Sequence, residues 1–102
     1  MTQVEIIGRD EKALTIALSG EIDSGNADDF FKAVSTAYGE KPCNLVFTCE
    51  GLDFIDSTTL GTFVKLTKMA KADGYTTTLR GLQAKVKKLF LICSLNTIME
   101  ID

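Results

Sequence analysis

The sequence of 102 residues contains no histidine, no tryptophan and a single proline. The absence of histidine excludes a Ser-His-Asp triad, a Cys-His dyad and a histidine-ligated metal within this chain. Its three cysteines, Cys43, Cys49 and Cys93, form no C-x-x-C motif, so we expect neither a disulfide framework nor a thiolate zinc site. Such cysteine usage is typical of a reducing cytoplasm. We therefore expect a cytoplasmic protein that holds no metal.

Long apolar runs and an excess of basic residues are also missing. The longest uncharged run, Leu89–Met99, is about half the length of a membrane span, and charges from Arg9 onward interrupt any targeting signal. The net charge is −3, although 11 acidic and 4 basic residues occupy positions 1–56, whereas 3 acidic and 7 basic residues occupy positions 57–102. The basic residues of the second half are expected on the solvated faces of helices. We therefore expect no nucleic-acid partner and no direct insertion into a membrane.

The hydrophobic pattern predicts a single α/β domain over residues 1–102. The expected strands are Gln3–Ile7, Leu14–Leu18, Leu45–Cys49, Tyr75–Leu79 and Thr97–Ile101, and the expected helices are Ala27–Tyr38, Thr58–Ala72 and Gln83–Leu91. The first two strands read as a hairpin, which gives one antiparallel pair. The later alternation of strands and helices favours parallel strands. The resulting order, β-β-α-β-α-β-α-β, predicts a mixed β-sheet with helices packed on it.

The stretch GLDFIDSTTLG over residues 51–61 joins a buried strand to the second expected helix. Asp56, Ser57 and Thr58 are all residue types that cap the amino end of a helix. Neither a G-K-[ST] phosphate loop nor a G-x-S-x-G nucleophile motif is present. A serine that accepts phosphate fits this position, because its dianion would meet the free N–H groups of a helix amino terminus. Helix capping and phosphate acceptance both remain open for these residues.

Three segments resemble those of a known family. Asp56–Gly61, preceded by LDFI, resembles the D-S-[ST]-G-L-G signature of STAS domains, above all that of the bacterial anti-sigma factor antagonists. The segment LSGEID at residues 18–23 resembles the family's L-x-G-E-[LI]-D. The segment AKVKKLF at residues 84–90 resembles its V-[KR]-[KR]-[LI]-[LF] helix. The resemblance covers nearly the whole chain, with the segments in order and similarly spaced.

This resemblance implies a regulatory binding protein rather than an enzyme, with no cofactor. Ser57 would be the residue that a partner anti-sigma factor serine kinase phosphorylates, and Asp56 would support that site. Asp23 would lie on the neighbouring loop within the kinase-binding surface, and Thr58 would have a lesser role. In the family, the dephosphorylated form binds the kinase and releases the sigma factor, and a metal-dependent serine phosphatase resets the switch.

The sequence departs from the family pattern in two places. Thr59 stands where the family usually has glycine, and we expect its β-branched side chain to narrow the approach to Ser57. The sequence ends at Asp102, where family members usually continue into a further helix, so we expect a truncated or short variant. The alternative function is a STAS subunit of a larger assembly without a phospho-switch, such as a lipid-transport ATPase complex or a signalling scaffold. An independent enzyme is disfavoured because Asp53 and Asp56 are explained by turn and cap chemistry.

Overall fold

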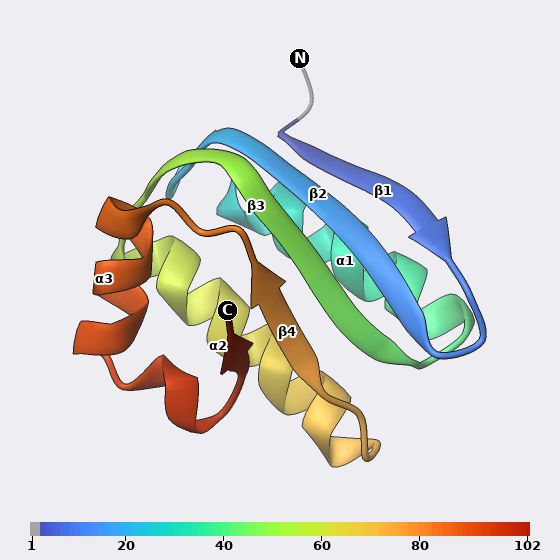
Figure 1. Ribbon diagram of the computed structural model, residues 1–102. Helices are drawn as coiled ribbons and strands as arrows, with labels where there is room; N and C mark the ends of the chain where they lie inside the picture. The colour runs from blue at the N-terminus through green and yellow to red at the C-terminus, as the bar shows by residue number, and fades with distance from the viewer. Residues whose placement is uncertain (1–2) are drawn as a thin grey trace.

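The computed structural model describes residues 3–102 and contains one five-stranded sheet of order β1-β2-β3-β4-β5 (Figure 1). β1 and β2 are antiparallel, and all later neighbours are parallel. The elements are β1 Val4–Arg9, β2 Ala13–Ile22, α1 Ala27–Glu40, β3 Asn44–Ile55, α2 Ser57–Ala72, β4 Thr77–Arg80, α3 Ala84–Ile92, a 3-10 turn Leu95–Thr97 and β5 Glu100–Ile101. The predicted mixed α/β sheet with helices packed on it is confirmed.

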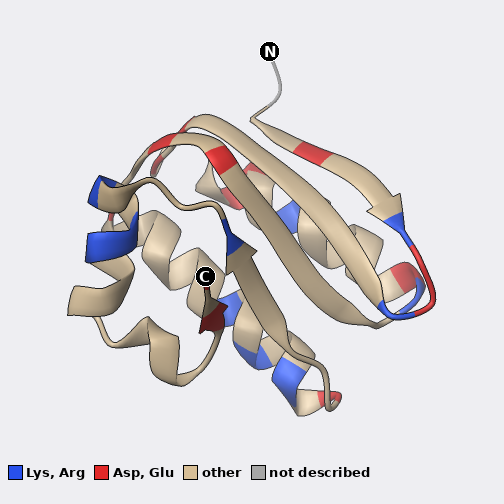
Figure 2. Ribbon diagram, viewed as in Figure 1, with Lys and Arg blue, Asp and Glu red and all other residues tan. Residues whose placement is uncertain are grey.

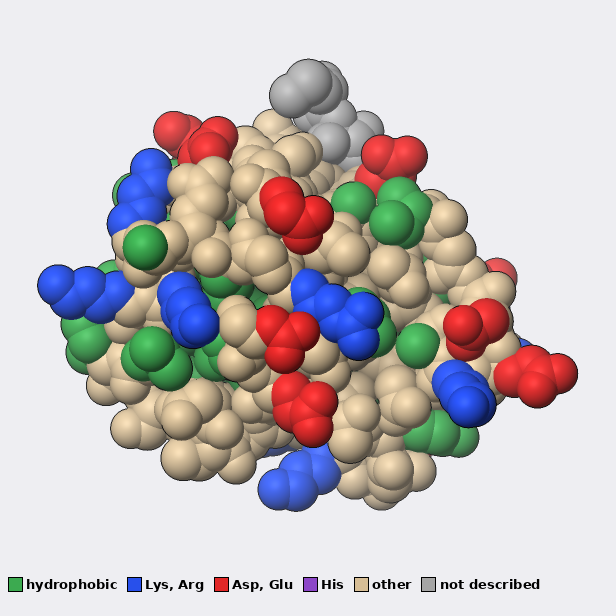
Figure 3. Space-filling view, in the orientation of Figure 1, with side chains coloured by type: hydrophobic (Ala, Val, Ile, Leu, Met, Phe, Trp, Pro, Cys, Tyr) green, Lys and Arg blue, Asp and Glu red, His purple; other side chains and the backbone are tan. Residues whose placement is uncertain are grey.

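The two faces of the sheet differ in what they bury. In Figure 1, α1 and α2 lie behind the strands. Alternate strand residues such as Ile16 and Phe47 are fully buried, and the ring of Phe47 packs against Phe30 of α1 and Phe63 of α2. The opposite face carries the intervening residues, among them Thr15, Ala17 and Thr48, which are half-buried. Figure 3 shows this face as mostly polar surface with scattered charges. The alternation of strand residues therefore sets which face receives the helices.

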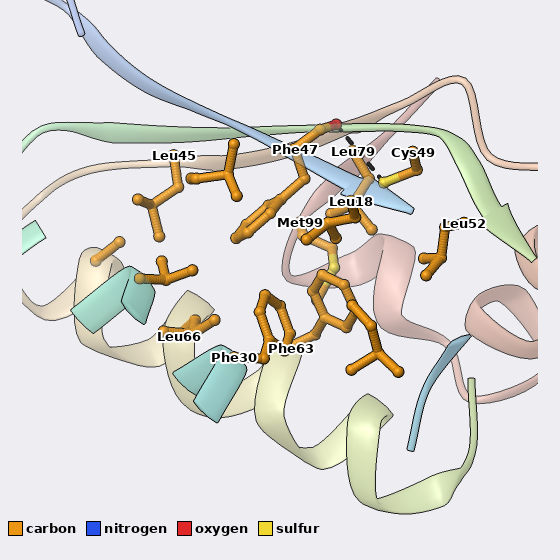
Figure 4. Close-up of a cluster of buried hydrophobic side chains, with 14 of the residues drawn as sticks. Leu18, Phe30, Leu45, Phe47, Cys49, Leu52, Phe63, Leu66, Leu79 and Met99 are labelled. Carbon is orange, nitrogen blue, oxygen red and sulfur yellow. Dashed lines mark hydrogen bonds between the residues drawn. The ribbon is translucent and has the colours of Figure 1, made fainter. Parts of the chain in front are cut away.

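Aromatic rings from four elements meet at the centre of the core. The ring of Phe63 on α2 lies 5.1 Å from that of Phe30 on α1, 5.4 Å from that of Phe47 on β3 and 5.2 Å from that of Phe90 on α3. All of these pairs are edge-to-face, and Figure 4 shows three of the rings converging. Phe63 is therefore the side chain that joins the three helices to the sheet.

The main correction to the predicted elements concerns β3, which continues past Cys49 to Ile55. Leu52 and Ile55 are buried, and they pair with Gly20 and Ile22 of β2 across two irregularities in register. These irregularities break the simple apolar alternation, so the sequence pattern ended the strand too early. The last strand is also shorter than predicted, because residues 95–97 form a 3-10 turn before it.

Gly61 offers a direct test of α2. It is an exposed helical residue, and a Cβ atom built there meets no heavy atom within 4 Å. We expect Gly61→Ala to raise the free energy of unfolding by about 0.5–1 kcal/mol, because alanine loses less backbone entropy in a helix. Gly81→Ala is the control, since Gly81 has a φ of +73° and its Cβ would collide with the Glu50 carboxylate. In urea denaturation, the free energy of unfolding should rise for Gly61→Ala and fall for Gly81→Ala. A fall for both variants would contradict the placement of Gly61 in a helix.

Candidate functional site

The predicted site lies where β2 and β3 end, at the left of Figure 1. Ile22 and Ile55 pair at the last position of the two parallel strands, so the loops that follow them leave the sheet together. The backbone N–H of Ser24 donates to Oδ2 of Asp56 at 2.9 Å. This bond joins the loop after β2 to the start of α2. The structure therefore brings the loop of Asp23 against the turn that carries Asp56 and Ser57.

Asp56 is the N-cap of α2. Its Oδ1 accepts the backbone N–H of Thr59 at 3.0 Å, and its Oδ2 accepts the N–H of Ser24 at 2.9 Å. The bond from the Thr59 N–H is the main cause that lowers the pKa of Asp56, and the Ser24 N–H adds to it. Capping therefore explains Asp56, which the sequence left as one of three candidates.

Ser57 and Thr58 occupy the first two helical positions, and both are exposed. Neither side chain makes a hydrogen bond to any residue from 3 to 102. The hydroxyl of Ser57 thus stands at a helix amino terminus with its oxygen accessible to solvent. This arrangement leaves a small nucleophilic oxygen free where an anion is favoured.

The expectation that Thr59 narrows the approach to Ser57 is wrong. Thr59 is fully buried, and its hydroxyl donates to the carbonyl oxygen of Ile22. Its Oγ1 also lies 3.0 Å from Oδ1 of Asp56. Two residues along a helix place side chains on nearly opposite sides, so Thr59 points into the protein while Ser57 points out. Thr59 therefore ties the start of α2 to the end of β2.

Asp23 shapes the loop that lies beside this helix start. Its Oδ1 accepts the N–H of Gly25 at 2.8 Å, and its carbonyl oxygen accepts the N–H of Ala27 at 2.8 Å. The side chain of Asn26 accepts the N–H of Asp23 at 2.8 Å and donates to the carbonyl of Glu21 at 3.0 Å. These bonds fix the loop, and the half-buried Asp23 remains at its surface.

Two further residues at this edge were missed by the sequence reasoning. Gln83, just before α3, donates from Nε2 to Oδ1 of Asp53 at 2.9 Å and to the carbonyl of Glu50 at 3.2 Å. Phe54 is 47% exposed although it lies within a strand. The sequence placed Phe54 in the connection after the strand, and nothing in it showed that a register irregularity of β3 turns this ring outward. Gln83 and Phe54 therefore lie at the same end of the sheet as Asp56 and Ser57, on the side of α3.

The charge at this edge is negative. Figure 2 shows acidic residues gathered at the ends of β2 and β3, with basic residues on α3 beside them. The acidic residues are Glu21, Asp23, Asp53 and Asp56. Any partner that covers this edge must therefore offset several carboxylates. The Ser57 hydroxyl lies within this acidic edge, which we define by these four residues.

Comparison of the sequence with models of known protein families identifies the family of this chain. A family model described as the STAS domain matches residues 2–102. The chain belongs to the STAS domain family. A comparison with curated protein sequences finds no match.

Solved structures share the fold of this STAS domain. The anti-sigma factor antagonist SpoIIAA in its unphosphorylated form has a TM-score of 0.77 and 19% identity, covering 97% of this chain and 86% of that one. The phosphorylated form of SpoIIAA from Bacillus has a TM-score of 0.73 and 24% identity, covering 98% and 89%. A putative anti-sigma factor antagonist from Thermotoga maritima has a TM-score of 0.83 and 23% identity, covering 96% and 82%. At such identities the likeness concerns the fold alone.

The described part of this STAS domain offers no group of three or more Cys, Asp or Glu side chains arranged to hold a metal ion. Within residues 3–102, no helix combines the length and the apolar character that crossing a bilayer requires. The edge offers the exposed hydroxyls of Ser57 and Thr58, a helix amino terminus and four carboxylates.

The cap of this STAS domain predicts a pH dependence of stability. The pKa of Asp56 is lower in the folded chain than in the unfolded chain, because of its N–H donors. The ionised cap therefore stabilises the fold fully above the unfolded pKa of about 3.9, and this contribution is lost as the pH falls through the lower folded pKa. We expect Asp56→Ala to lower the thermal midpoint at pH 7.

The difference between wild type and Asp56→Ala should shrink as the pH falls from about 5 toward 2. Asp56→Asn is the matched control, because asparagine also caps helices but does not titrate. The difference in thermal midpoint between Asp56→Asn and Asp56→Ala should be smaller than that between wild type and Asp56→Ala, and it should not change with pH. Thermal unfolding monitored by circular dichroism measures all three proteins. A gap between wild type and Asp56→Ala that is unchanged at pH 2 would contradict this role of the carboxylate.

Proposed function

We propose that this chain is an anti-sigma factor antagonist in a partner-switching system. It binds an anti-sigma factor serine kinase when Ser57 is unphosphorylated, and phosphorylation of Ser57 releases it. The observation that carries this proposal is the free, exposed hydroxyl of Ser57 at the amino terminus of α2, while Asp56 alone provides the cap. The two SpoIIAA structures, one unphosphorylated and one phosphorylated, support the proposal by analogy of fold.

The kinase-binding surface in this proposal comprises Asp23, Asp56, Ser57 and Thr58, to which we add the exposed ring of Phe54. The bond from the Ser24 N–H to Asp56 holds the two loops side by side. An exposed aromatic ring supplies contact area at low entropic cost, as interface anchors do. The acidic edge selects a partner that presents basic side chains around its own active site. The chain acts here as one STAS domain of residues 1–102 that binds and is modified, and it catalyses no reaction itself.

A serine phosphatase resets the switch by removing the phosphate. For a phosphatase to reach it, the phosphoserine must stay on the surface, and the exposed position of Ser57 meets this need. Such switches operate in the cytoplasm, where we expect the chain to work.

The alternative is a STAS subunit of a larger assembly without a phospho-switch. Crowding of Ser57 by the Thr59 side chain would favour this alternative, because it would hinder phosphorylation. The buried Thr59 side chain takes that reason away. Phosphorylation of Ser57 by the kinase separates the two functions, because only the partner-switching function requires it.

Incubation of the chain with ATP and the anti-sigma serine kinase encoded nearest to it tests the proposal. Mass spectrometry of the digested product locates the phosphate. We expect one phosphate on Ser57 and none on Ser57→Ala. In Thr58→Ala the phosphate should still be found on Ser57, because Thr58 is equally exposed but is not the acceptor. Phosphate on Thr58, or no phosphate on any residue, would favour the assembly subunit instead.

A further inference from the structure

Three large apolar side chains near the end of α3 are left in solvent. Leu89, Leu91 and Ile92 are 39%, 44% and 68% exposed. Val86 and Phe90 of the same helix are buried and attach it to the core. Single exposed apolar side chains are common on protein surfaces, but a contiguous patch marks a place where another surface docks. The outer face of α3 is therefore a candidate docking surface.

Lysines on the first half of α3 give this patch a basic border. Lys85 and Lys88 are exposed, Lys87 is half-buried, and none of the three forms an ion pair with any residue from 3 to 102. Lys88 and Ile92 lie four positions apart on the helix and therefore share one side of it. Figure 3 shows basic and apolar side chains together at the left of the molecule, where α3 lies. A partner for this face must combine negative charge with apolar surface.

The acidic edge offers this combination on the same chain. It carries four carboxylates, and the ring of Phe54, which is 47% exposed, lies between Asp53 and Asp56 in the sequence. The edge and α3 are neighbours, because Gln83, directly before α3, donates to Oδ1 of Asp53 at 2.9 Å. Figure 2 shows the lysines of α3 beside the acidic ends of β2 and β3. Each molecule therefore carries two complementary surfaces side by side at one end.

We propose that two copies of this chain associate through these two surfaces, with α3 of each copy against the acidic edge of the other. Because the surfaces are neighbours, a two-fold rotation brings both pairs together at the same time. Such an arrangement closes the assembly at two copies, which is the commonest symmetry of homo-oligomers. Lys85 and Lys88 approach the partner's carboxylates, and the apolar side chains of α3 are removed from water.

The charges of the molecule favour a second copy over a lipid surface. A helix face that is both basic and apolar is also suited to anionic lipids. The four carboxylates of the acidic edge lie next to these lysines, however, and anionic headgroups would repel them. The net charge of −3 opposes approach to such a surface as well. The same carboxylates that disfavour lipid are the ones that a second copy uses.

Self-association goes beyond the proposed function and has a consequence for it. Ser57 lies within the acidic edge, so the dimer covers the hydroxyl that the kinase must reach. The interface consists of one short helix and one edge, and interfaces of this small kind are weak and transient. The dimer forms without any kinase, so its measurement does not depend on the phospho-switch.

Sedimentation velocity of the full chain, from low micromolar to millimolar concentration, tests the proposal. We expect a reversible conversion of monomer to dimer with a dissociation constant on the order of 0.1 mM, and no larger species. Raising the sodium chloride concentration from about 0.05 M to about 0.5 M should weaken the dimer at least about tenfold, because exposed charge pairs are screened by salt. A chain that stays monomeric at millimolar concentration overturns the proposal.

Charge reversal assigns the two surfaces. The double variants Lys85→Glu/Lys88→Glu and Glu21→Lys/Asp53→Lys should each weaken self-association at least about tenfold, because like charges then meet at both contacts of the dimer. All four positions are exposed, and circular dichroism checks that the variants fold. An equimolar mixture of the two variants should restore the dimer, since opposite charges again face each other at both contacts. A mixture that stays monomeric overturns the proposal.

Two further variants separate a specific interface from a general effect of charge or of lipid affinity. Lys68→Glu/Lys71→Glu makes the same change in net charge on exposed positions of α2, and it should dimerise like wild type. Ile92→Ser should weaken the dimer roughly tenfold and leave the thermal midpoint unchanged, because this side chain is mostly exposed in the monomer. A control as weak as Lys85→Glu/Lys88→Glu, or binding to phosphatidylglycerol vesicles that Ile92→Ser abolishes, would overturn the assignment of this face to a second copy.

Discussion

Replacement of Phe63 by alanine is expected to lower the free energy of unfolding by about 3–5 kcal/mol. Phe63 is fully buried, and it is the one ring that contacts Phe30, Phe47 and Phe90 together. Edge-to-face aromatic pairs contribute about 0.5–1.5 kcal/mol each beyond their buried area. A loss of this size is a large part of the roughly 5–15 kcal/mol that stabilises a typical domain.

Urea denaturation followed by circular dichroism measures this loss. Phe54→Ala is the matched control, because the same change at a 47% exposed position should cost clearly less. If Phe63→Ala does not fold, Phe63→Leu keeps an apolar side chain and should still cost roughly 1–2 kcal/mol. Equal losses for Phe63→Ala and Phe54→Ala would show that the aromatic cluster is not the centre of the core.

Phosphorylation of Ser57 is expected to reduce the affinity for the serine kinase at least about 100-fold while the chain stays folded. The phosphate adds about −1.5 to −2 charges at pH 7. Within the free chain, the amino terminus of α2 stabilises this charge by about 0.3–1 kcal/mol, which opposes repulsion from the ionised Asp56. The two local effects act in opposite directions on an exposed group, so the fold should be retained.

The balance changes when a partner covers the acidic edge. Glu21, Asp23, Asp53 and Asp56 already make this edge negative, and a phosphate adds further negative charge that the partner would have to match. Burial of an unpaired charge costs several kcal/mol, and each 1.4 kcal/mol weakens binding tenfold. Ser57→Asp should weaken binding less than phosphate does, because it carries a single charge. Ser57→Ala should bind as tightly as the unmodified chain and should not respond to ATP.

Most of the fold could be predicted from sequence, because its strands and helices have clear periodicity. β3 is the main exception, besides the shorter last strand. Its register slips near Gly51, so the buried Leu52 and Ile55 no longer follow a period of two. The position of Ser57 at a helix start was also predictable from the run Asp56-Ser57-Thr58. Which of these three residues caps the helix was not, because all three are capping residue types. Only the structure shows that Asp56 accepts the N–H of Thr59 and also that of Ser24, 32 residues earlier in the chain.

Helical spacing already places the side chains of Ser57 and Thr59 on nearly opposite sides of α2, but the sequence could not show what the Thr59 side chain contacts. Its hydroxyl finds the carbonyl of Ile22 at the end of β2, a contact that only the assembled sheet creates.

The most direct test of the phospho-switch is an isothermal titration of the serine kinase with one preparation of the chain in three states. These are the unmodified chain, the chain phosphorylated by that kinase, and the same sample after treatment with a serine phosphatase. We expect the unmodified chain to bind tightly, the phosphorylated chain to bind at least about 100-fold more weakly, and the phosphatase-treated chain to recover the full affinity. The circular dichroism spectrum should be the same in all three states. Equal affinity in all three states, with phosphate verified on Ser57, would contradict the phospho-switch.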